Sequence, residues 1–428
     1  MALSPLPAKR RASGDRNRDH RELRALRELT AGRGALVIIG KVNAPLLDRS
    51  PTLTGPTWAE VSLDALRQNF GAVRKHVGEG VSICAVVKAD AYGHGAAACA
   101  RALESEHAAW FGVTGTEEAM ALRRAGIRAR LVLMTGIWRG EEEQVVANNL
   151  TPIVWEHWHV ERLEGAAAKK QTVLPVHLKI DTGMTRLGAS REALPGVCTA
   201  IASSGHLMLE GVSTHFASVR DPEKTRKQVV LFEEALTLLI SNGLRPVLVH
   251  MANSAAILSR SETWKTMVRP GIALYGYSRS RPAGVAQAAE VAAPLRPVLS
   301  WKTRVIALKE VGVGEGVGYG GTFVTQRRTR IAVLPVGYAD GFHRLLSNRG
   351  RVIVRGEYAP VAGRVSMDLT TVDVTGIAGV VVGDEVILLG EGNGKSIDAG
   401  EHARICETIP YEILCSISKR VPRVYVGS

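Results

Sequence analysis

Lys88 stands at the end of an apolar run, "SICAVVK" over residues 82–88, and a loop of small residues, "ADAYGHG", follows it. An ammonium group near low-dielectric walls and other cations loses proton affinity, so it becomes a usable amine nucleophile. Such a lysine can form a Schiff base with a carbonyl cofactor. The plainer alternative is a solvated lysine at a strand end that takes no part in chemistry.

Polar side chains also stand near the ends of four later apolar runs. Enzymes built on a β/α barrel carry their chemistry at the C-terminal ends of the strands. Any one of these residues alone could be a structural residue with satisfied hydrogen bonds, but their common placement predicts one concave site. They are Lys179, Asp181 and Arg186 around the run 173–180, His215 in 207–216, His250, Asn253 and Ser254 after 246–251, and Arg269 and Gly271 in 267–276.

The segments "MANSAA" and "RPGIALYG" offer groups that could hold a phosphate. Backbone N–H groups beside Gly271, together with the Ser254 hydroxyl, can surround an anion. Short polar residues also simply cap helices. A Schiff-base lysine together with a phosphate site suits pyridoxal 5′-phosphate. We find no zinc, EF-hand or P-loop pattern, so no metal site is expected.

The elements that must position these residues alternate along the chain. Apolar runs rich in Val, Ile and Leu are separated by charged, amphipathic stretches. The stretch 221–243 begins with Asp-Pro and ends at Asn-Gly, which are helix start and stop signals. The alternation predicts an N-terminal (β/α)8 barrel of the TIM type. The runs are 82–88, 109–114, 130–135, 151–155, 173–180, 207–216, 246–251 and 267–276.

After about residue 290 the pattern changes to closely spaced strand-like runs joined by glycine turns, as in "GRVIVRGEYAPVAGRVSMDLTTVDVT". This pattern predicts a separate, C-terminal all-β domain. We therefore expect an α/β plus β chain in three parts: a basic extension over 1–55, a cofactor-binding barrel over 56–289, and the β domain over 290–428.

The net charge of +13 on 428 residues is concentrated at the start of the chain, where residues 1–50 hold 11 Lys and Arg against 5 Asp and Glu. We expect this segment to be mostly disordered, as a basic tail, a targeting segment or the product of an upstream start codon. The remainder is mildly basic, which suits anionic small ligands as well as nucleic acid, so a nucleic-acid partner is not our expectation.

Other features of the composition indicate a cytoplasmic protein. The five cysteines are scattered without metal or disulfide spacing, which suits a reducing compartment. No apolar run reaches the roughly 18–20 residues that span a bilayer, and the N-terminus lacks a secretory cleavage pattern.

From about residue 56 to 425 the sequence resembles the alanine racemases, pyridoxal-phosphate enzymes of fold type III. Nine motifs in the family's order carry this resemblance. They are "AVVKADAYGHG" (85–95), "HLKIDTGMTRLG" (177–188), "THFA" (214–217), "HMANSAA" (250–256), "RPGIALYG" (269–276), "GYGGTF" (318–323), "GYADGF" (337–342), "GRVSMD" (363–368) and "YEILCSISKRVPR" (411–423). The resemblance implies the same two domains, a first strand near "TWAEVSL" paired with the second domain, and a homodimer with shared active sites.

The resemblance also implies roles for residues that match the family's motifs. Lys88 would hold the cofactor and act as the base for the D-enantiomer, and Tyr319 would be the opposite base for the L-enantiomer. Arg186 would lie near the cofactor's phenolic oxygen and the substrate carboxylate, and the backbone of Met367 would contact the substrate. Lys179 matches a lysine that is carbamylated in some members.

The remaining matched residues would surround the cofactor. Arg269 would face the pyridine nitrogen, with His215 between it and Tyr319, and Asn253 would lie beside the cofactor. A narrow entrance bounded by Tyr338 and Tyr411 would favour a methyl side chain. The phosphate-binding set would be Tyr92, Ser254, Gly271, Ile272 and Tyr411.

The implied activity is the interconversion of L-alanine and D-alanine, which would supply D-alanine for peptidoglycan. A broad-specificity or serine racemase on the same scaffold is the main alternative. A fold-type-III decarboxylase would share the barrel lysine, but "GYGGTF" and "GRVSMD" favour a racemase. A pyridoxal-phosphate-carrying homeostasis protein would be a single barrel, so the second domain argues against it.

Overall fold

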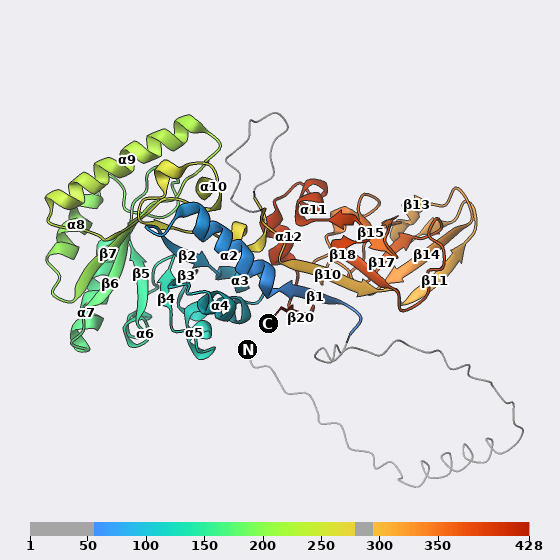
Figure 1. Cartoon of the computed structure of the whole chain (residues 1–428), viewed down its shortest axis with the longest axis horizontal. Helices are drawn as coiled ribbons and strands as arrows, with labels where there is room; N and C mark the ends of the chain where they lie inside the picture. The colour runs from blue at the N-terminus through green and yellow to red at the C-terminus, as the bar shows by residue number, and fades with distance from the viewer. Residues whose placement is uncertain (1–54, 279–293, 428) are drawn as a thin grey trace, which may run out of the picture. The chain divides into compact units, whose positions relative to one another are not determined.

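The computed structural model describes residues 55–278 and 294–427, and Figure 1 shows their helices and strands. The predicted N-terminal extension lies outside the described residues, apart from Gly55. The predicted boundary between 289 and 290 also lies outside them, so the division at that point stays a prediction.

Eight parallel strands form a nearly closed barrel, in the order β8-β7-β6-β5-β4-β3-β2-β9. The two end strands also meet, because the backbone N–H groups of Thr266 and Arg269 donate to the carbonyls of Val249 and Ala252. Every expected run overlaps a strand, so the barrel prediction is confirmed. The strands are β2 (Ser82–Val86), β3 (Trp110–Val113), β4 (Arg130–Leu133), β5 (Leu150–Val154), β6 (Leu174–Lys179), β7 (Leu207–Ser213), β8 (Leu248–His250) and β9 (Met267–Val268).

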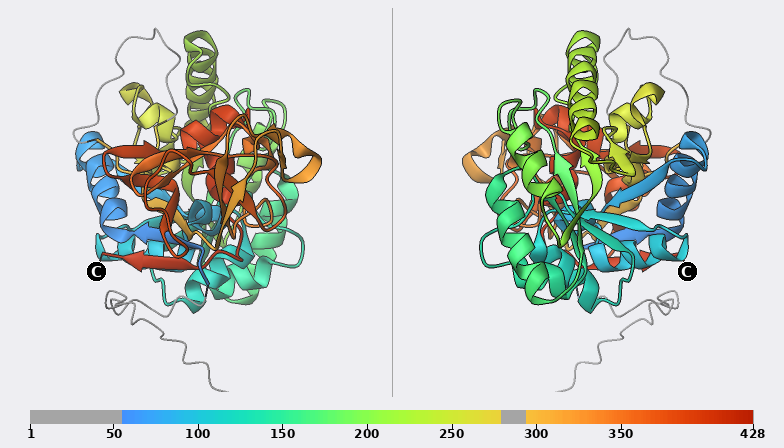
Figure 2. Two further views of the ribbon diagram at one scale, coloured as in Figure 1. Left: turned by 90° about the vertical axis from the view of Figure 1, so that its right-hand side faces the viewer. Right: turned by 90° about the vertical axis from the view of Figure 1, so that its left-hand side faces the viewer.

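Helices lie around the outside of these strands, as the right-hand view of Figure 2 shows. The longest, α9 (Pro222–Ser241), begins where its sequence predicts: the Asp221 side chain accepts from the Lys224 N–H, and Pro222 occupies the first turn. The other barrel helices are α2 (Leu63–Val77), α3 (Lys88–Gly93), α4 (Ala96–Ser105), α5 (Thr116–Arg124), α6 (Glu142–Ala147), α7 (His157–Lys169), α8 (Leu194–Ala202) and α10 (Ser254–Ile257), with single turns η1 (Ser261–Thr263) and η2 (Ile272–Tyr275).

The second domain is rich in sheet and contains the first strand of the described chain. Strand β1 (Trp58–Ser62) pairs antiparallel with β10 (Leu299–Arg304) and parallel with β20 (Arg423–Val426), and Figure 1 shows it in blue beside them. The expectation that the "TWAEVSL" strand pairs with the second domain is therefore confirmed. The same sheet continues through β18 (Glu385–Gly392), β15 (Arg351–Val354) and β16 (Glu357–Pro360), with β19 (Lys395–Ile397) on β18.

A smaller sheet joins β11 (Ala307–Val311), β14 (Thr329–Leu334) and β17 (Thr370–Asp373), and β12 (Gly316–Val317) pairs with β13 (Phe323–Val324). The expected all-β domain also contains two short helices, α11 (Ala399–Ile405) and α12 (Pro410–Ser416), and the turns η3 (Tyr319–Gly321) and η4 (Arg344–Leu346). Local signals explain the helices, since the Asp398 side chain caps α11 and Pro410 starts α12.

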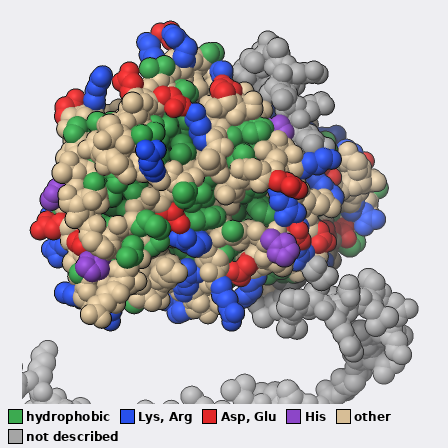
Figure 3. Space-filling view, turned by 60° about the vertical axis from the view of Figure 1, so that its left-hand side comes forward, with side chains coloured by type: hydrophobic (Ala, Val, Ile, Leu, Met, Phe, Trp, Pro, Cys, Tyr) green, Lys and Arg blue, Asp and Glu red, His purple; other side chains and the backbone are tan. Residues whose placement is uncertain are grey.

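The side chains buried in the core come from the apolar runs, as predicted. Phe111, Leu131, Leu133 and Leu150 from neighbouring barrel strands are fully buried. Figure 3 shows some apolar side chains on the barrel surface, interspersed with lysine and arginine. Within 55–278 and 294–427, no helix combines the length and apolar character that crossing a bilayer requires.

Candidate active site

Lys88 begins a tight turn that follows β2, at the C-terminal end of a barrel strand. The next four residues, Ala89, Asp90, Ala91 and Tyr92, all have left-handed backbone angles, with φ between 52° and 55°. This conformation costs an L-residue roughly 1–2 kcal/mol. Surrounding contacts must therefore hold this turn in place, and nothing in "KADAYG" signals the conformation in advance.

Contacts on several sides hold the turn. The carboxylate of Glu118 accepts from the Ala89 N–H at 2.8 Å, and the Asp90 carboxylate accepts from the Ala96 N–H at 2.7 Å. Gly93, with φ of +82°, ends the turn under α12, and a Cβ there would lie 2.5 Å from the Leu414 carbonyl oxygen. Only glycine therefore fits this position without movement of the backbone.

The turn directs Tyr92 into a group of aromatic rings. Its ring centroid lies 4.9 Å from that of Tyr275 and 5.8 Å from that of Tyr411. Its hydroxyl reaches Gly271, where a Cβ would come within 2.4 Å of the Tyr92 oxygen. Burial raises the pKa of Tyr92, so its hydroxyl stays protonated and can donate.

Ser254 and Gly271 form a small polar cradle next to Tyr92. The Ser254 Oγ accepts from the backbone N–H groups of Gly271 at 2.8 Å and Ala273 at 3.2 Å. No residue of the described ranges accepts the Ser254 hydroxyl hydrogen, so this group can donate to an anion. Ile272, the first residue of η2, lies between the two donors. Because Gly271 has no Cβ, the Tyr92 hydroxyl comes close to it, so the hydroxyls of Tyr92 and Ser254 both lie beside Gly271, and such a donor set suits a phosphate.

Asn253 has a structural contact of its own. Its side-chain oxygen accepts from the N–H groups of Ala255 and Ala256, so it caps the first turn of α10. Helix capping is the alternative that the sequence left open for such residues.

Positive charges converge near Lys88. Burial lowers its pKa, and Arg186 lowers it further. Lys179, the last residue of β6, has a pKa of about 8 because of burial and because Arg269, Arg186 and Lys88 are near it. Burial and the same cations lower the pKa of His215 to about 3, so His215 is neutral at physiological pH. The cluster favours uncharged amines and attracts anions.

Arg269 is the most buried of these cations, with 4% of its surface exposed. One terminal nitrogen donates to His250 Nδ1 and to the His250 carbonyl, both at 2.7 Å. The other donates to the carbonyls of Thr214 and Met251, at 2.7 and 3.1 Å. Of the five guanidinium N–H groups, only Nε–H has no acceptor among the described residues. Burial lowers the pKa of Arg269 to about 10, so it remains charged.

Two comparisons with known proteins assign this chain to a family. The family model "Alanine racemase, N-terminal domain" matches residues 61–279, and "Alanine racemase, C-terminal domain" matches residues 298–425. The alanine racemase of Halothermothrix orenii is 42% identical over 375 residues, 87% of this chain and 97% of the relative. That of Geobacter sulfurreducens is 41% identical over 378 residues, 87% of this chain and 97% of the relative.

This chain belongs to the alanine racemase family. Solved alanine racemases share its fold. The structure from Streptomyces lavendulae has a TM-score of 0.81 at 35% identity, covering 88% of this chain and 98% of that one. The structure from Bacillus anthracis has a TM-score of 0.80 at 33% identity, covering 88% and 97%. The protein is therefore an amino-acid racemase, an isomerase, and the recognition of the family from its motifs is confirmed.

This chain does not by itself bring all the predicted site residues together. Tyr319 begins η3 in the second domain with 71% of its surface exposed, and Met367 is 53% exposed. Within the described residues, no hydrogen bond or ring contact joins either of them to Lys88. The Arg364 guanidinium lies near the turn that begins at Tyr319, since a Cβ on Gly320 would lie 3.6 Å from one of its nitrogens.

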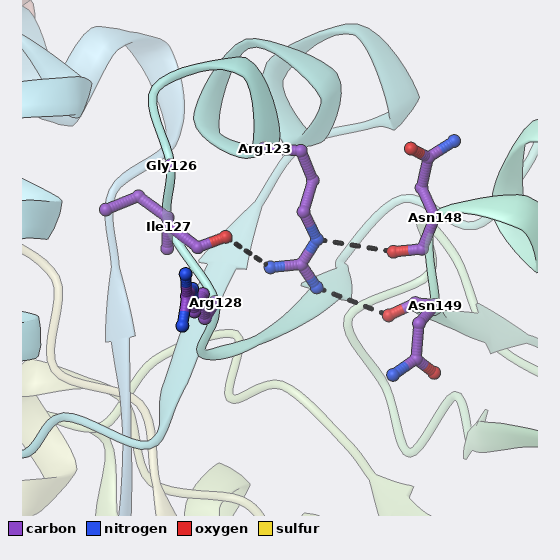
Figure 4. A pocket seen from close by; sticks show the side chains of 6 residues that line it. All are labelled: Arg123, Gly126, Ile127, Arg128, Asn148 and Asn149. Atoms are coloured by element: carbon purple, nitrogen blue, oxygen red, sulfur yellow. Dashed lines mark hydrogen bonds between the residues drawn. The ribbon is translucent and has the colours of Figure 1, made fainter.

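Two cavities lie beside residues whose contacts have structural roles. A cavity of about 550 Å³ lies between the Lys88 turn, α5 and the segment that carries Cys415, Lys419 and Arg423. A second, of about 400 Å³, surrounds Arg123, whose guanidinium donates to the carbonyls of Ile127, Asn148 and Asn149 (Figure 4). These bonds connect the loops that precede β4 and β5, so Arg123 is structural.

Sequence reasoning missed part of the polar interior of the barrel. His177 and Glu210 lie within β6 and β7, are buried, and form a chain with His250. A signal was available, since a histidine and a glutamate interrupt the apolar runs "VLPVHLKI" and "LMLEGV". Buried polar groups require partners, so such interruptions predict a polar network.

Proposed function

We propose that this protein interconverts L-alanine and D-alanine with pyridoxal 5′-phosphate as its cofactor. Lys88 would hold the cofactor's aldehyde carbon. Its depressed pKa supports this role, because a neutral amine is the reactive form. When bound, the cofactor accepts the electron pair that remains after the α-proton leaves. Family membership is the observation that carries this proposal.

The Ser254 and Gly271 cradle would hold the cofactor's phosphate. The donors would be the Ser254 hydroxyl, the Tyr92 hydroxyl and the backbone N–H of Ile272, since the N–H groups of Gly271 and Ala273 already donate to Ser254. Tyr411 would close this side. Arg269 would offer its Nε–H to the ring nitrogen without giving up the proton, because arginine keeps its charge. Arg186, His215 and Asn253 would complete the surroundings of the cofactor.

Two bases on opposite faces would move the proton. Racemisation removes the α-proton from one side and returns a proton to the other, so one base cannot serve both directions equally. Lys88 would act on the D-enantiomer and Tyr319 on the L-enantiomer. An ordinary tyrosine has a pKa near ~10, so nearby cations must stabilise its phenolate. Met367 would contact the substrate through its backbone.

A homodimer with shared active sites is the assembly that we propose. The exposure of Tyr319 and Met367 supports it, since side chains with these roles must be enclosed when they work. In this arrangement the second domain of one subunit would bring Tyr319 to Lys88 of the partner. Tyr338, also exposed, would narrow the entrance so that a methyl side chain is favoured.

Lys179 would be carbamylated. Its pKa of about 8 leaves a usable fraction of neutral amine at physiological pH, and neutral amines react with CO2. The added negative charge would relieve the repulsion that Lys179 feels from Arg186 and Arg269. Protein labelled with ¹³C-bicarbonate should then show a carbamate carbon signal that is lost in Lys179→Gln.

The reaction would take place in the cytoplasm and would supply D-alanine for peptidoglycan. The deciding experiment is proton NMR of L-alanine in D2O with purified protein and pyridoxal phosphate, beside L-serine, L-arginine and L-lysine, with chiral analysis. Rapid α-deuteration and D-alanine formation with alanine alone supports the proposal. Exchange across the panel indicates a broad-specificity racemase. No exchange in protein that holds the cofactor contradicts racemase function, and Lys88→Ala is the matched negative control.

A further inference from the structure

A line of polar side chains crosses the interior of the barrel behind Arg269. We propose that Glu210, acting through His177 and His250, fixes the hydrogen-bonding direction of this line and so holds Arg269 in its working orientation. Glu210 and His177 are thus positioning residues for the racemase. This inference rests on the proposed role of Arg269 toward the cofactor's ring nitrogen.

Short contacts join the members of the line. His250 Nδ1 lies 2.7 Å from an Arg269 terminal nitrogen, and His250 Nε2 lies 3.0 Å from His177 Nδ1. The last contact is longer: His177 Nε2 lies 3.6 Å from a Glu210 carboxylate oxygen, which is an electrostatic contact and not a hydrogen bond, and no described residue accepts a hydrogen bond from this nitrogen. Both imidazoles are fully buried, and 9% of Glu210 is exposed. The line therefore has no access to bulk water along its middle part.

The two ends of the line determine every proton between them. Arginine can only donate, so His250 Nδ1 must accept and His250 must carry its proton on Nε2. That proton points at His177 Nδ1, which must accept in turn. His177 then carries its proton on Nε2, which faces the Glu210 carboxylate at 3.6 Å, and the negative charge of the carboxylate favours an N–H group at that position. Both histidines are neutral, in agreement with the lowering of their pKa values by burial.

Arg130 anchors the acceptor end. Its guanidinium makes two hydrogen bonds to the Glu210 carboxylate, at 2.8 and 2.7 Å, and a third to the Thr151 hydroxyl at 3.1 Å. It also lies over the Trp110 ring, 4.4 Å from the centroid. A bidentate pair of this kind keeps the carboxylate ionised and fixed in orientation. The opposite direction of the line is thereby excluded.

Reversal of the hydrogen-bond direction along the line would change the orientation of the Arg269 guanidinium. With a donor in place of the carboxylate, both histidines could move their protons to Nδ1, and His250 would then present an N–H group to the Arg269 N–H. Two donors cannot share that 2.7 Å contact, so the guanidinium would have to rotate. The Nε–H group, which alone remains available on Arg269, would then leave the position that the ring nitrogen needs.

The first test measures the histidine protons directly in cofactor-free protein labelled with ¹⁵N-histidine. Wild-type His177 and His250 should both show the Nε2–H tautomer, and the finding of an Nδ1–H or doubly protonated ring at either position would overturn the inference. Glu210→Gln should shift one or both resonances toward the other tautomer. Glu164→Gln, which alters a separate pair with His206, should leave them unchanged.

The second test measures the effect of the Arg269 orientation on the ring nitrogen of the bound cofactor. Protein loaded with pyridoxal phosphate labelled at the ring nitrogen should show a changed ¹⁵N shift in Glu210→Gln and an unchanged shift in Glu164→Gln. We expect kcat to fall roughly ten- to a hundredfold, the range typical of lost supporting contacts, with KM changed less than kcat. An unchanged ring-nitrogen shift and kcat would overturn the inference while leaving the racemase function intact. Should Glu210→Gln not fold, Glu210→Asp, which keeps a carboxylate near Arg130 but withdraws it from His177, takes its place, and unchanged histidine and ring-nitrogen shifts in that variant would overturn the inference.

A different experimental result would show that the proposed function is wrong. Wild-type protein that binds no cofactor, or that holds it and exchanges no α-proton, would contradict the function while the tautomers of His177 and His250 remain as stated.

Discussion

The Arg423 guanidinium donates from Nε to the carbonyl oxygen of Gly93 at 3.0 Å, and so connects strand β20 to the turn that carries Lys88 and Tyr92. Its terminal nitrogens donate to the carbonyls of Ile417, Ser418 and Val421. One side chain of the second domain thus fixes both its own loop and the end of a strained turn in the barrel.

Removal of this guanidinium should weaken both the fold and cofactor binding. Arg423→Met keeps the apolar stem and removes the guanidinium donor from four carbonyls, of which that of Ser418 also accepts from the Val421 N–H, so we expect a loss of roughly 2–4 kcal/mol in the free energy of unfolding. Pyridoxal-phosphate affinity should fall as well, because Tyr92 is less well placed. Urea unfolding and cofactor titration measure the two effects. Arg191→Met, which removes an exposed ion pair with Glu234, should cost less than about 1 kcal/mol. Equal losses in both variants would contradict this account.

Because the turn is left-handed, a glycine substitution in it should not lower the free energy of unfolding as it does in a right-handed helix. Ala89→Gly relieves roughly 1–2 kcal/mol of strain at an exposed position and loses about 0.5–1 kcal/mol through the added freedom of the unfolded chain. We expect no loss, or a small gain, in unfolding free energy. Ala121→Gly, at an exposed position inside the right-handed helix α5, should lose about 1 kcal/mol. Urea unfolding of both variants is the measurement, and a loss at Ala89 equal to that at Ala121 would argue against the strain.

Lys179 should make stability depend on pH in buffer free of CO2. Its folded-state pKa of about 8 lies below the ordinary value of 10.5, so the unfolded chain holds more protons between these values. Stability therefore rises with pH over this range, and below it the buried charge costs up to about 3 kcal/mol. Lys179→Met should be more stable than wild type near pH 7, and its advantage should shrink toward pH 10.

Bicarbonate provides the control for that measurement. Carbamylation stabilises only a chain that has the amine, so added bicarbonate should raise the urea midpoint of wild type and leave Lys179→Met unchanged. A difference between the two proteins that does not vary with pH, in the absence of CO2, would contradict the depressed pKa.

Shared active sites predict that two inactive variants complement each other. Lys88→Ala and Tyr319→Phe should each be inactive alone. A mixed dimer would contain one site with both residues intact, so equimolar mixing with subunit exchange should restore roughly a quarter of wild-type activity. Racemase assays before and after mixing test this. Mixtures that stay inactive although mass spectrometry shows mixed dimers would mean that Lys88 and Tyr319 serve the same site within one chain.

The barrel and the positions of its polar residues were predictable because they follow from short-range patterns. Alternating apolar runs and the Asp221-Pro222 start of α9 predicted the elements, and the strand-end rule predicted where Lys88, Lys179 and Arg269 would lie. The left-handed turn was not predictable, because Ala89 and Ala91 have no local preference for positive φ. Contacts with Gly93 from distant parts of the chain impose it. The direction of the His250 and His177 line depends on Arg130 and Glu210, which come from other strands.

Strand β1 has a consequence for how the protein is made. It leaves the ribosome before any of the barrel, yet its two partners, β10 and β20, come after the barrel and at the end of the chain. During synthesis β1 must wait with both edges unpaired until β10 emerges, and with the edge that pairs with β20 unpaired until the last residues emerge. A nascent chain that is cut short can therefore complete its barrel strands but not the sheet beside them, and release from the ribosome is the step that lets the second domain close.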